Sequence, residues 1–178
     1  MAASHPLGPC WSARLVSQRI FAAVKHGSGS FPHSQTYMGY PLTCAAALAV
    51  QQVIARDNLL ANVRKQGAHL ERRLRERFGN HHHVGDVRGR GLLWGVEIVA
   101  DRASKAPFAA DLKLHARVKQ KAIERALLVY PSGGNVDGHS GDQVLLAPPF
   151  IVTEPDIEVI VETLALAIDD ALVEIGTA

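Results

Sequence analysis

The stretch VGDVRGRGLLWGVEIVA, residues 84–100, places Gly89, Gly91 and Gly95 among apolar and charged residues. It predicts two strand segments around these glycines. A glycine-rich run can also bind phosphate, but this spacing matches neither the dinucleotide-binding fingerprint nor the P-loop, and no strand-then-helix context follows. Glycine inside a strand more often marks a bulge or a close approach of backbone. We therefore interpret the stretch as structural.

Helices and strands alternate downstream of this stretch. The patterns predict an amphipathic helix at 111–126, short strands at 127–133 and 142–150, and a closing helix at 153–175. Thr153 is the expected N-cap of the closing helix, with acidic residues behind it at the positive end of the helix dipole. Because the connections are short, residues from about 80 onward are expected to form a compact α+β unit.

The N-terminal third has a different pattern. Residues 13–17 are interpreted as the end of a strand, and 17–27 as a short helix with Ser17 as its N-cap. A Gly/Ser-rich loop follows, and Pro41 begins a long helix. The run PLTCAAALAVQQVIARD, residues 41–57, is apolar on nearly every side, which predicts a buried helix. Beyond Asp57 the pattern becomes amphipathic, as expected of a helix that bridges two packing environments.

Composition narrows the functional classes. The chain has 178 residues, of which 47% are hydrophobic, and a net charge of +2, so an ordinary globular core is expected and neither nucleic acid nor a membrane is implied. No window has the length and apolarity of a membrane span. Cys10 and Cys44 have no metal-ligand spacing, which favours a reduced, cytoplasmic protein. No Asp or Glu precedes Asp57, which is also one mark of an organelle transit peptide, so an organelle is the alternative location.

Two polar clusters have alternative interpretations. Residues 64–77 are rich in arginine and could form a basic face for nucleic acid, but Glu71 and Glu76 are interleaved with them, which favours a solvated helix with weak ion pairs. Nucleic-acid binding is therefore the less favoured alternative. The three histidines at 81–83 could ligate a metal, but no cysteine or carboxylate cluster supports them. We interpret them as a solvated loop and expect no metal site.

Three stretches together resemble one family, the class III pyridoxal-phosphate aminotransferases of fold type I. They are FPHSQTYMGYPLTCAAALAV, VGDVRGRGLLWGVEIV and VLLAPPFIVTEPDIE, and the resemblance covers residues 15–175. It implies an α/β fold in which the tail of the large domain is followed by an α+β small domain, a short antiparallel sheet covered by helices. The implied divisions are a large-domain remnant at 1–56, a bridging helix at 57–80 and the small domain at 81–178.

The resemblance also implies roles for the loop before Pro41. In the family, a threonine equivalent to Thr36 donates to the phosphate of the pyridoxal phosphate held by the partner subunit, and Tyr37 is a weaker candidate. A hydroxyl beside a helix start suits an anion, although both side chains could instead satisfy loop backbone. The family usually has glycine at Ser34 and histidine at Tyr40. Many members carry a carboxylate-binding arginine where this chain has Leu145.

The family's main catalytic group is expected to be missing. At family spacing the Schiff-base lysine falls near Ala2, and Lys25 is out of register, so no catalytic residue is assigned. The partner aspartate of the pyridine nitrogen and the main phosphate loop also belong upstream. We therefore expect a C-terminal portion of an aminotransferase that does not transfer amino groups alone and has little capacity to bind the cofactor alone.

The expected partner is a second copy of the chain or a complementing N-terminal half. The sequence leaves open whether the chain is truncated or one piece of a split enzyme. The main functional alternative is a non-catalytic module for dimerisation or complementation, to which the apolar helix from Pro41 would contribute.

Overall fold

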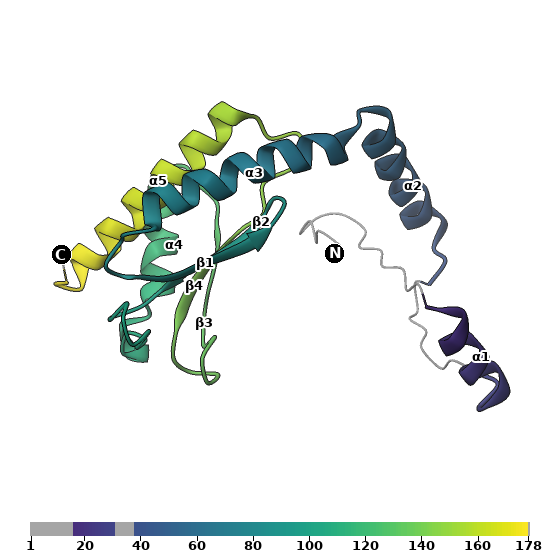
Figure 1. The fold of residues 1–178 in the computed structure, drawn as a ribbon, viewed down its shortest axis with the longest axis horizontal. Helices are drawn as coiled ribbons and strands as arrows, with labels where there is room; N and C mark the ends of the chain where they lie inside the picture. Colours follow the sequence, from purple (N-terminus) through teal and green to yellow (C-terminus); the bar gives the residue numbers. More distant parts are fainter. Residues whose placement is uncertain (1–15, 31–37, 178) are drawn as a thin grey trace. The chain divides into compact units, whose positions relative to one another are not determined.

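A computed structural model of the chain describes residues 16–30 and 38–177 (Figure 1). These residues separate into two units, one ending at Asp57 and one beginning at Asn58. Thr36 and Tyr37 lie outside the described residues. So do residues 13–15 of the expected strand end, and Val16 and Ser17 are not in a strand.

The first unit contains two helices, α1 (Gln18–His26) and α2 (Pro41–Arg56). The predicted helix at 17–27 is confirmed: the Ser17 hydroxyl accepts the backbone N–H of Ile20 at 3.4 Å, and Gly27 ends the helix by donating to Ala23. Helix α2 begins at Pro41, as predicted, because proline has no N–H to leave unpaired in the first turn.

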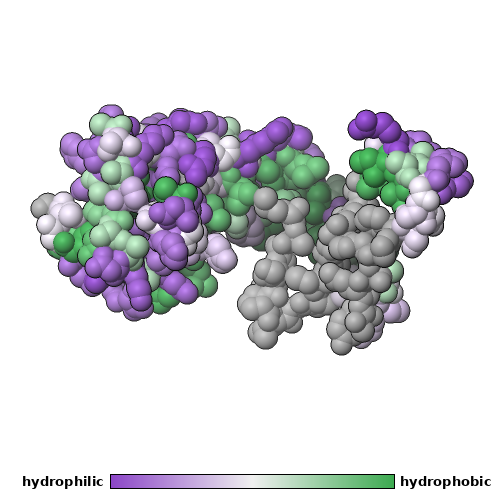
Figure 2. All heavy atoms as spheres, turned by 90° about the horizontal axis from the view of Figure 1, so that it is seen from below, coloured by the Kyte–Doolittle hydropathy of each residue, from purple (hydrophilic) through white to green (hydrophobic). Residues whose placement is uncertain are grey.

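The prediction that α2 is buried is wrong for the single chain. Its one buried residue is Thr43, whereas Leu42, Leu48 and Val50 are 61%, 60% and 53% exposed. Figure 2 shows hydrophobic residues among hydrophilic ones at the surface of the described part of the chain. A helix that is apolar on every side needs a covering surface on every side, and the described residues of this chain leave much of α2 uncovered.

The second unit is a layer of helices on one face of a four-stranded sheet (Figure 1). The strand order is β1-β2-β4-β3, and every neighbouring pair is antiparallel. The α+β small domain implied by the resemblance is therefore present. Its elements are α3 (Leu59–Phe78), β1 (Val84–Arg90), β2 (Leu93–Ile98), the short 3-10 helix η1 (Ala110–Leu112), α4 (Leu114–Glu124), β3 (Tyr130–Gly133), β4 (Asp142–Leu146) and α5 (Glu154–Glu174).

Strand β2 alternates strictly between the two faces of the sheet. Trp94, Val96 and Ile98 are buried beneath the helices, while Leu93 and the residues at 95 and 97 point to the other face and are half-buried. The Trp94 indole N–H donates to the Gly91 carbonyl at 2.8 Å, so the largest core side chain leaves no buried donor unpaired. Fully burying an apolar side chain contributes about 1.5–3 kcal/mol, which makes this row central to the stability of the unit.

Two glycines of the opening stretch are structural, as predicted. A β-carbon at Gly89 would lie 2.5 Å from the Trp94 ring. Gly91 has φ +59, and its carbonyl oxygen would lie 2.6 Å from a β-carbon at Gly67 of α3. The missing side chains therefore allow helix α3 to pack directly on the turn between β1 and β2.

The ends of α4 and α5 are capped in different ways. Thr153 and Asp156 form a capping box at the start of α5, which confirms the predicted N-cap. Helix α4 begins at Leu114, and the side chain of its N-cap residue, Lys113, makes no capping hydrogen bond. Asp142 of β4 supplies the cap instead: its buried carboxylate accepts the His115 backbone N–H at 2.8 Å and pairs with the His115 ring at 2.6 Å.

Helix α3 joins α5 through a row of ion pairs. The pairs within α3, Arg72 with Glu76 and Arg75 with Glu71, agree with a solvated basic helix. Other arginines of α3, however, cross to α5. Arg73 contacts Glu158 at 2.7 Å and Glu162 at 3.2 Å, and Arg77 contacts Asp169 at 2.9 Å. Part of the positive charge of α3 is therefore neutralised by ion pairs with α5.

The histidine run at 81–83 is only partly a solvated loop. His81 pairs with Asp169 at 2.9 Å, and the His83 ring contacts the Val99 carbonyl at 3.1 Å. His82 alone of the three is exposed. The prediction of a solvated run is wrong for the other two residues because both are held by contacts distant in sequence.

The ion-pair row predicts a loss of stability in acid. The hydrogen bond from Arg73 is the main reason why the pKa of Glu158 lies below its ordinary value of 4.5, and it also lowers the pKa of Glu76. A carboxyl group with a lowered folded-state pKa contributes stability above its unfolded pKa and loses it as the pH falls through the folded value. We expect the urea concentration at the unfolding midpoint to decrease as the pH is lowered below about 4.5. In Arg73→Met this decrease should be smaller.

The matched control is Arg64→Met, because Arg64 is exposed on the same helix and forms no ion pair with any described residue. Its pH profile should follow the wild type. If stability depended on pH in the same way in Arg73→Met and in the wild type, the ion pairs of Arg73 would not be the cause of the acid sensitivity.

Candidate cofactor and substrate site

The loop that leads into α2 contains the two residues predicted to contact the cofactor, Thr36 and Tyr37. The structure describes the loop only from Met38 onward, so the roles of Thr36 and Tyr37 stay predictions. In the described part, Gly39 has φ +72, a conformation that glycine adopts without strain. Tyr40 then takes the N-cap position of α2.

The start of α2 suits an anion. Tyr40 provides no side-chain cap, Pro41 occupies the first helical position, and the first turn contains no acidic residue. The Thr43 hydroxyl donates to the Tyr40 carbonyl at 2.7 Å and so does not cap the helix either. The positive end of the helix dipole is therefore not neutralised from within α2. This chemistry fits the phosphate end of pyridoxal phosphate.

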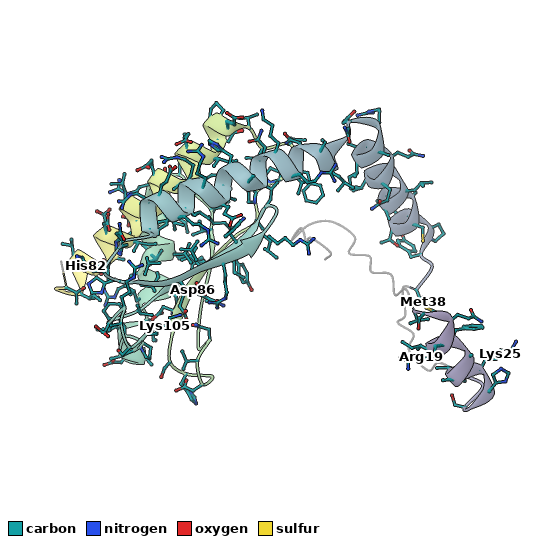
Figure 3. All side chains as sticks on the ribbon, in the orientation of Figure 1. Arg19, Lys25, Met38, His82, Asp86 and Lys105 are labelled. Carbon is teal, nitrogen blue, oxygen red and sulfur yellow. The ribbon has the colours of Figure 1, made fainter. Side chains whose placement is uncertain are left out.

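The lysines of the described residues fit the aldehyde end of that cofactor poorly. Lys25 is in the last turn of α1 and exposed, where its charge is favourable at the negative end of the helix (Figure 3). Lys65, the next lysine in the sequence, pairs with Glu154 at 2.9 Å. Of the other four lysines, three are exposed and Lys121 pairs with Glu174 at 3.2 Å. None of the described lysines therefore occupies the kind of buried, desolvated site that activates a lysine amine.

The face of the sheet opposite the helices forms a second candidate site, here called the open face. Arg88 of β1 pairs with Gly95 of β2, and Gly95 pairs with Leu145 of β4. Leu145 also pairs with Tyr130 of β3. Because directly paired residues of antiparallel strands point to the same side, these four positions form one row across the open face.

Charged groups fix the position of Arg88. Its Nη1 donates to Asp86 at 2.9 Å and to Glu97 at 3.4 Å, and Asn135 donates to the other oxygen of Glu97. The hydrogen bond from Arg88 is the main reason why the pKa of Asp86 is lowered, so this carboxylate is charged at neutral pH. Asp86 lies on β1 near Lys105 (Figure 3). Sequence reasoning identified Leu145 but missed Arg88, because the row becomes visible only with the strand register.

Other site classes have less support among residues 16–30 and 38–177. No group of three or more His, Cys, Asp or Glu side chains there could hold a metal ion, and Cys44 is an exposed free thiol. None of the helices in that part of the chain combines the length and apolarity of a membrane span.

Comparison with known proteins gives a consistent result. The family model "Aminotransferase class-III" matches residues 7–168. An uncharacterised aminotransferase of Schizosaccharomyces pombe is 40% identical over 157 residues, which are 88% of this chain and 34% of that protein. The diaminobutyrate–2-oxoglutarate transaminase of Halomonas elongata is 32% identical over 171 residues, which are 93% of this chain and 35% of that protein.

A solved structure shows the same similarity in three dimensions. The PMP-bound form of an aminotransferase from Vibrio fluvialis superimposes with a TM-score of 0.72 and 31% identity, covering 90% of this chain and 33% of that one. Another structure of an aminotransferase from the same organism is PLP-bound. The fold is thus that of a C-terminal part of a pyridoxal-phosphate transaminase. The chain belongs to the class III aminotransferase family, and it spans about a third of the length of the relatives it matches.

Proposed function

We propose that these 178 residues supply the C-terminal part of a class III aminotransferase. The reaction is transfer of an amino group from an amine or amino acid to a 2-oxo acid such as pyruvate. The observation that carries the proposal is the family match over residues 7–168, together with structural similarity over most of the chain. Within it, residues 1–56 belong to the cofactor-binding domain, 57–80 bridge the domains, and 81–178 form the small domain.

The cofactor of this enzyme is pyridoxal phosphate, which supplies an electron sink for the amino-group transfer. Thr36 donates from its hydroxyl to the phosphate held by the partner subunit, and Tyr37 is a second, weaker contact to the cofactor. The uncapped start of α2, with no acidic residue in its first turn, favours the phosphate charge. These residues orient the cofactor and carry out no proton transfer.

Proton transfer belongs to a lysine that the described residues do not supply. Lys25 is exposed at the end of α1, and Lys65 is paired with Glu154. We therefore propose that the 178 residues do not catalyse transamination by themselves, and that the reactive lysine comes from polypeptide beyond them, in the same protein or in a complementing chain.

A covalent-trapping experiment tests this part of the proposal. The purified chain is titrated with pyridoxal phosphate and reduced with borohydride, and its intact mass is measured. We expect no stoichiometric adduct, because no described lysine lies in the kind of buried, desolvated site that activates a lysine amine. Peptide mapping should then find only scattered labelling. A stoichiometric adduct on one lysine would contradict the proposal.

A second candidate function is a non-catalytic module that pairs with a full-length or split transaminase. The observation that favours it is the exposed apolar surface of α2, above all Leu42, Leu48 and Val50. An apolar helix surface of this kind is typical of an interaction site. The partner is a second copy of the chain or an N-terminal half.

The module predicts self-association that depends on α2. Light scattering after gel filtration should give the wild-type chain a mass above the 19.2 kDa of the monomer. Leu48→Glu should lower the mass to that of the monomer, because a buried unpaired charge is costly in an interface. Gln51→Glu adds the same charge at an exposed polar position of α2 and should have a smaller effect. A monodisperse wild-type monomer would count against the module acting through self-association.

A further inference from the structure

Neither the backbone conformation nor the packing of the described fold requires glycine at position 95. Of the 14 glycines that the structure describes, seven have positive φ, and six others would bring a β-carbon within 3.0 Å of another atom. A β-carbon at Gly95 would instead meet Leu145 Cδ2 at 3.4 Å and the Arg88 carbonyl at 3.8 Å, which are ordinary contacts. Glycine in the middle of a strand lowers stability, and it often marks a place where a ligand approaches the backbone closely.

Arg88, Gly95 and Leu145 lie side by side on the open face, and the space above Gly95 between the two side chains is here called the slot. Strands in a sheet are about 4.8 Å apart, so the backbones that carry Arg88 and Leu145 are about 10 Å apart, with Gly95 as the floor between them. Leu145 forms a half-buried apolar side, and beyond it lies Tyr130, which is 70% exposed. The slot thus has a cationic end and an apolar end.

Arg88 has unused hydrogen-bonding capacity at the cationic end. Its side chain is 56% exposed, and only Nη1 is engaged among the described residues, with Asp86 and Glu97. This leaves Nε and Nη2, the edge of the guanidinium that can hold a carboxylate with two parallel hydrogen bonds. Because Asp86 and Glu97 offset the charge, selectivity comes from this hydrogen-bond geometry more than from long-range attraction.

We propose that this slot binds a carboxylate with an apolar body: Arg88 binds the carboxylate, Gly95 admits the ligand to the sheet, and Leu145 with Tyr130 contacts the apolar part. The ligand class is a 2-oxo acid or amino acid with an aliphatic or aromatic side chain. The assignment rests on the proposed function, in which such acids are substrates. Arg88 is then a specificity-determining residue that compensates for the neutral side chain at Leu145.

The test is an NMR titration of the full chain, which needs no catalytic turnover. The ligands are 4-methyl-2-oxopentanoate, pyruvate and the uncharged amide of the first acid. We expect saturable shifts centred on the amides of Gly95 and Leu145 and on the Arg88 Nε–H. The larger acid should bind about tenfold more tightly than pyruvate, because it buries more apolar carbon. The amide should cause no saturable shift.

Two variants distinguish an effect on ligand binding from an effect on the stability of the fold. Arg88→Gln should abolish binding of both acids, whereas Arg90→Gln, a charge change two residues along β1 on the same face, should leave it unchanged. Gly95→Ala should leave the thermal midpoint unchanged or raised, since its β-carbon meets no clash, yet weaken binding at least fivefold.

Several results would overturn the proposal. They are the absence of any saturable shift with either acid, equal shifts with the uncharged amide, and unchanged affinity in Arg88→Gln or Gly95→Ala. The outcome is distinguishable from that of the proposed function. If the acids bind at Arg88 but the chain never supports transamination, the carboxylate site stands and the proposed function is wrong. If transamination is supported but no acid binds at Arg88, the proposed function stands and the carboxylate site is wrong.

Discussion

The alternation of side chains along β2 is the constraint on which the second unit depends. The strand lies inside the sheet, between β1 and β4, so its two faces set the two faces of the whole layer. Trp94, Val96 and Ile98 anchor the core beneath the helices. The same register leaves Gly95 on the open face, opposite Arg88 and Leu145. A shift of one residue would exchange the two sets, so core and candidate site are fixed together.

Local sequence signals were sufficient for most elements of the second unit. The glycine-flanked strands, the closing helix and the Thr153 cap follow from periodicity and capping chemistry, and each is present. Contacts between residues distant in sequence could not be predicted in this way. The cap that Asp142 gives to α4 comes from another strand, and the bonds that hold His81 and His83 also come from distant segments.

Helix α2 shows a different limit of sequence reasoning. Its composition correctly indicates a helix suited to burial, but composition cannot say which polypeptide covers it. In the single chain Leu42 and Leu48 remain exposed. The chain also spans only about a third of its relatives, and an uncovered apolar helix is what the proposed C-terminal part of a larger enzyme would contain. The candidate site shows the same division: the role of Thr36 is a prediction from the resemblance, whereas the row around Gly95 needed the strand register.

Complementation tests the central claim most directly. Residues 15–178 are fused behind the preceding two thirds of the Schizosaccharomyces pombe relative, and amino transfer to pyruvate is measured with pyridoxal phosphate present, beside the 178-residue chain alone. The account predicts turnover by the fusion and by its Thr36→Ser variant, at least tenfold weaker cofactor affinity in Thr36→Ala, and no turnover by the chain alone. Turnover by the chain alone at the rate of the fusion would contradict it, as would a folded fusion without activity.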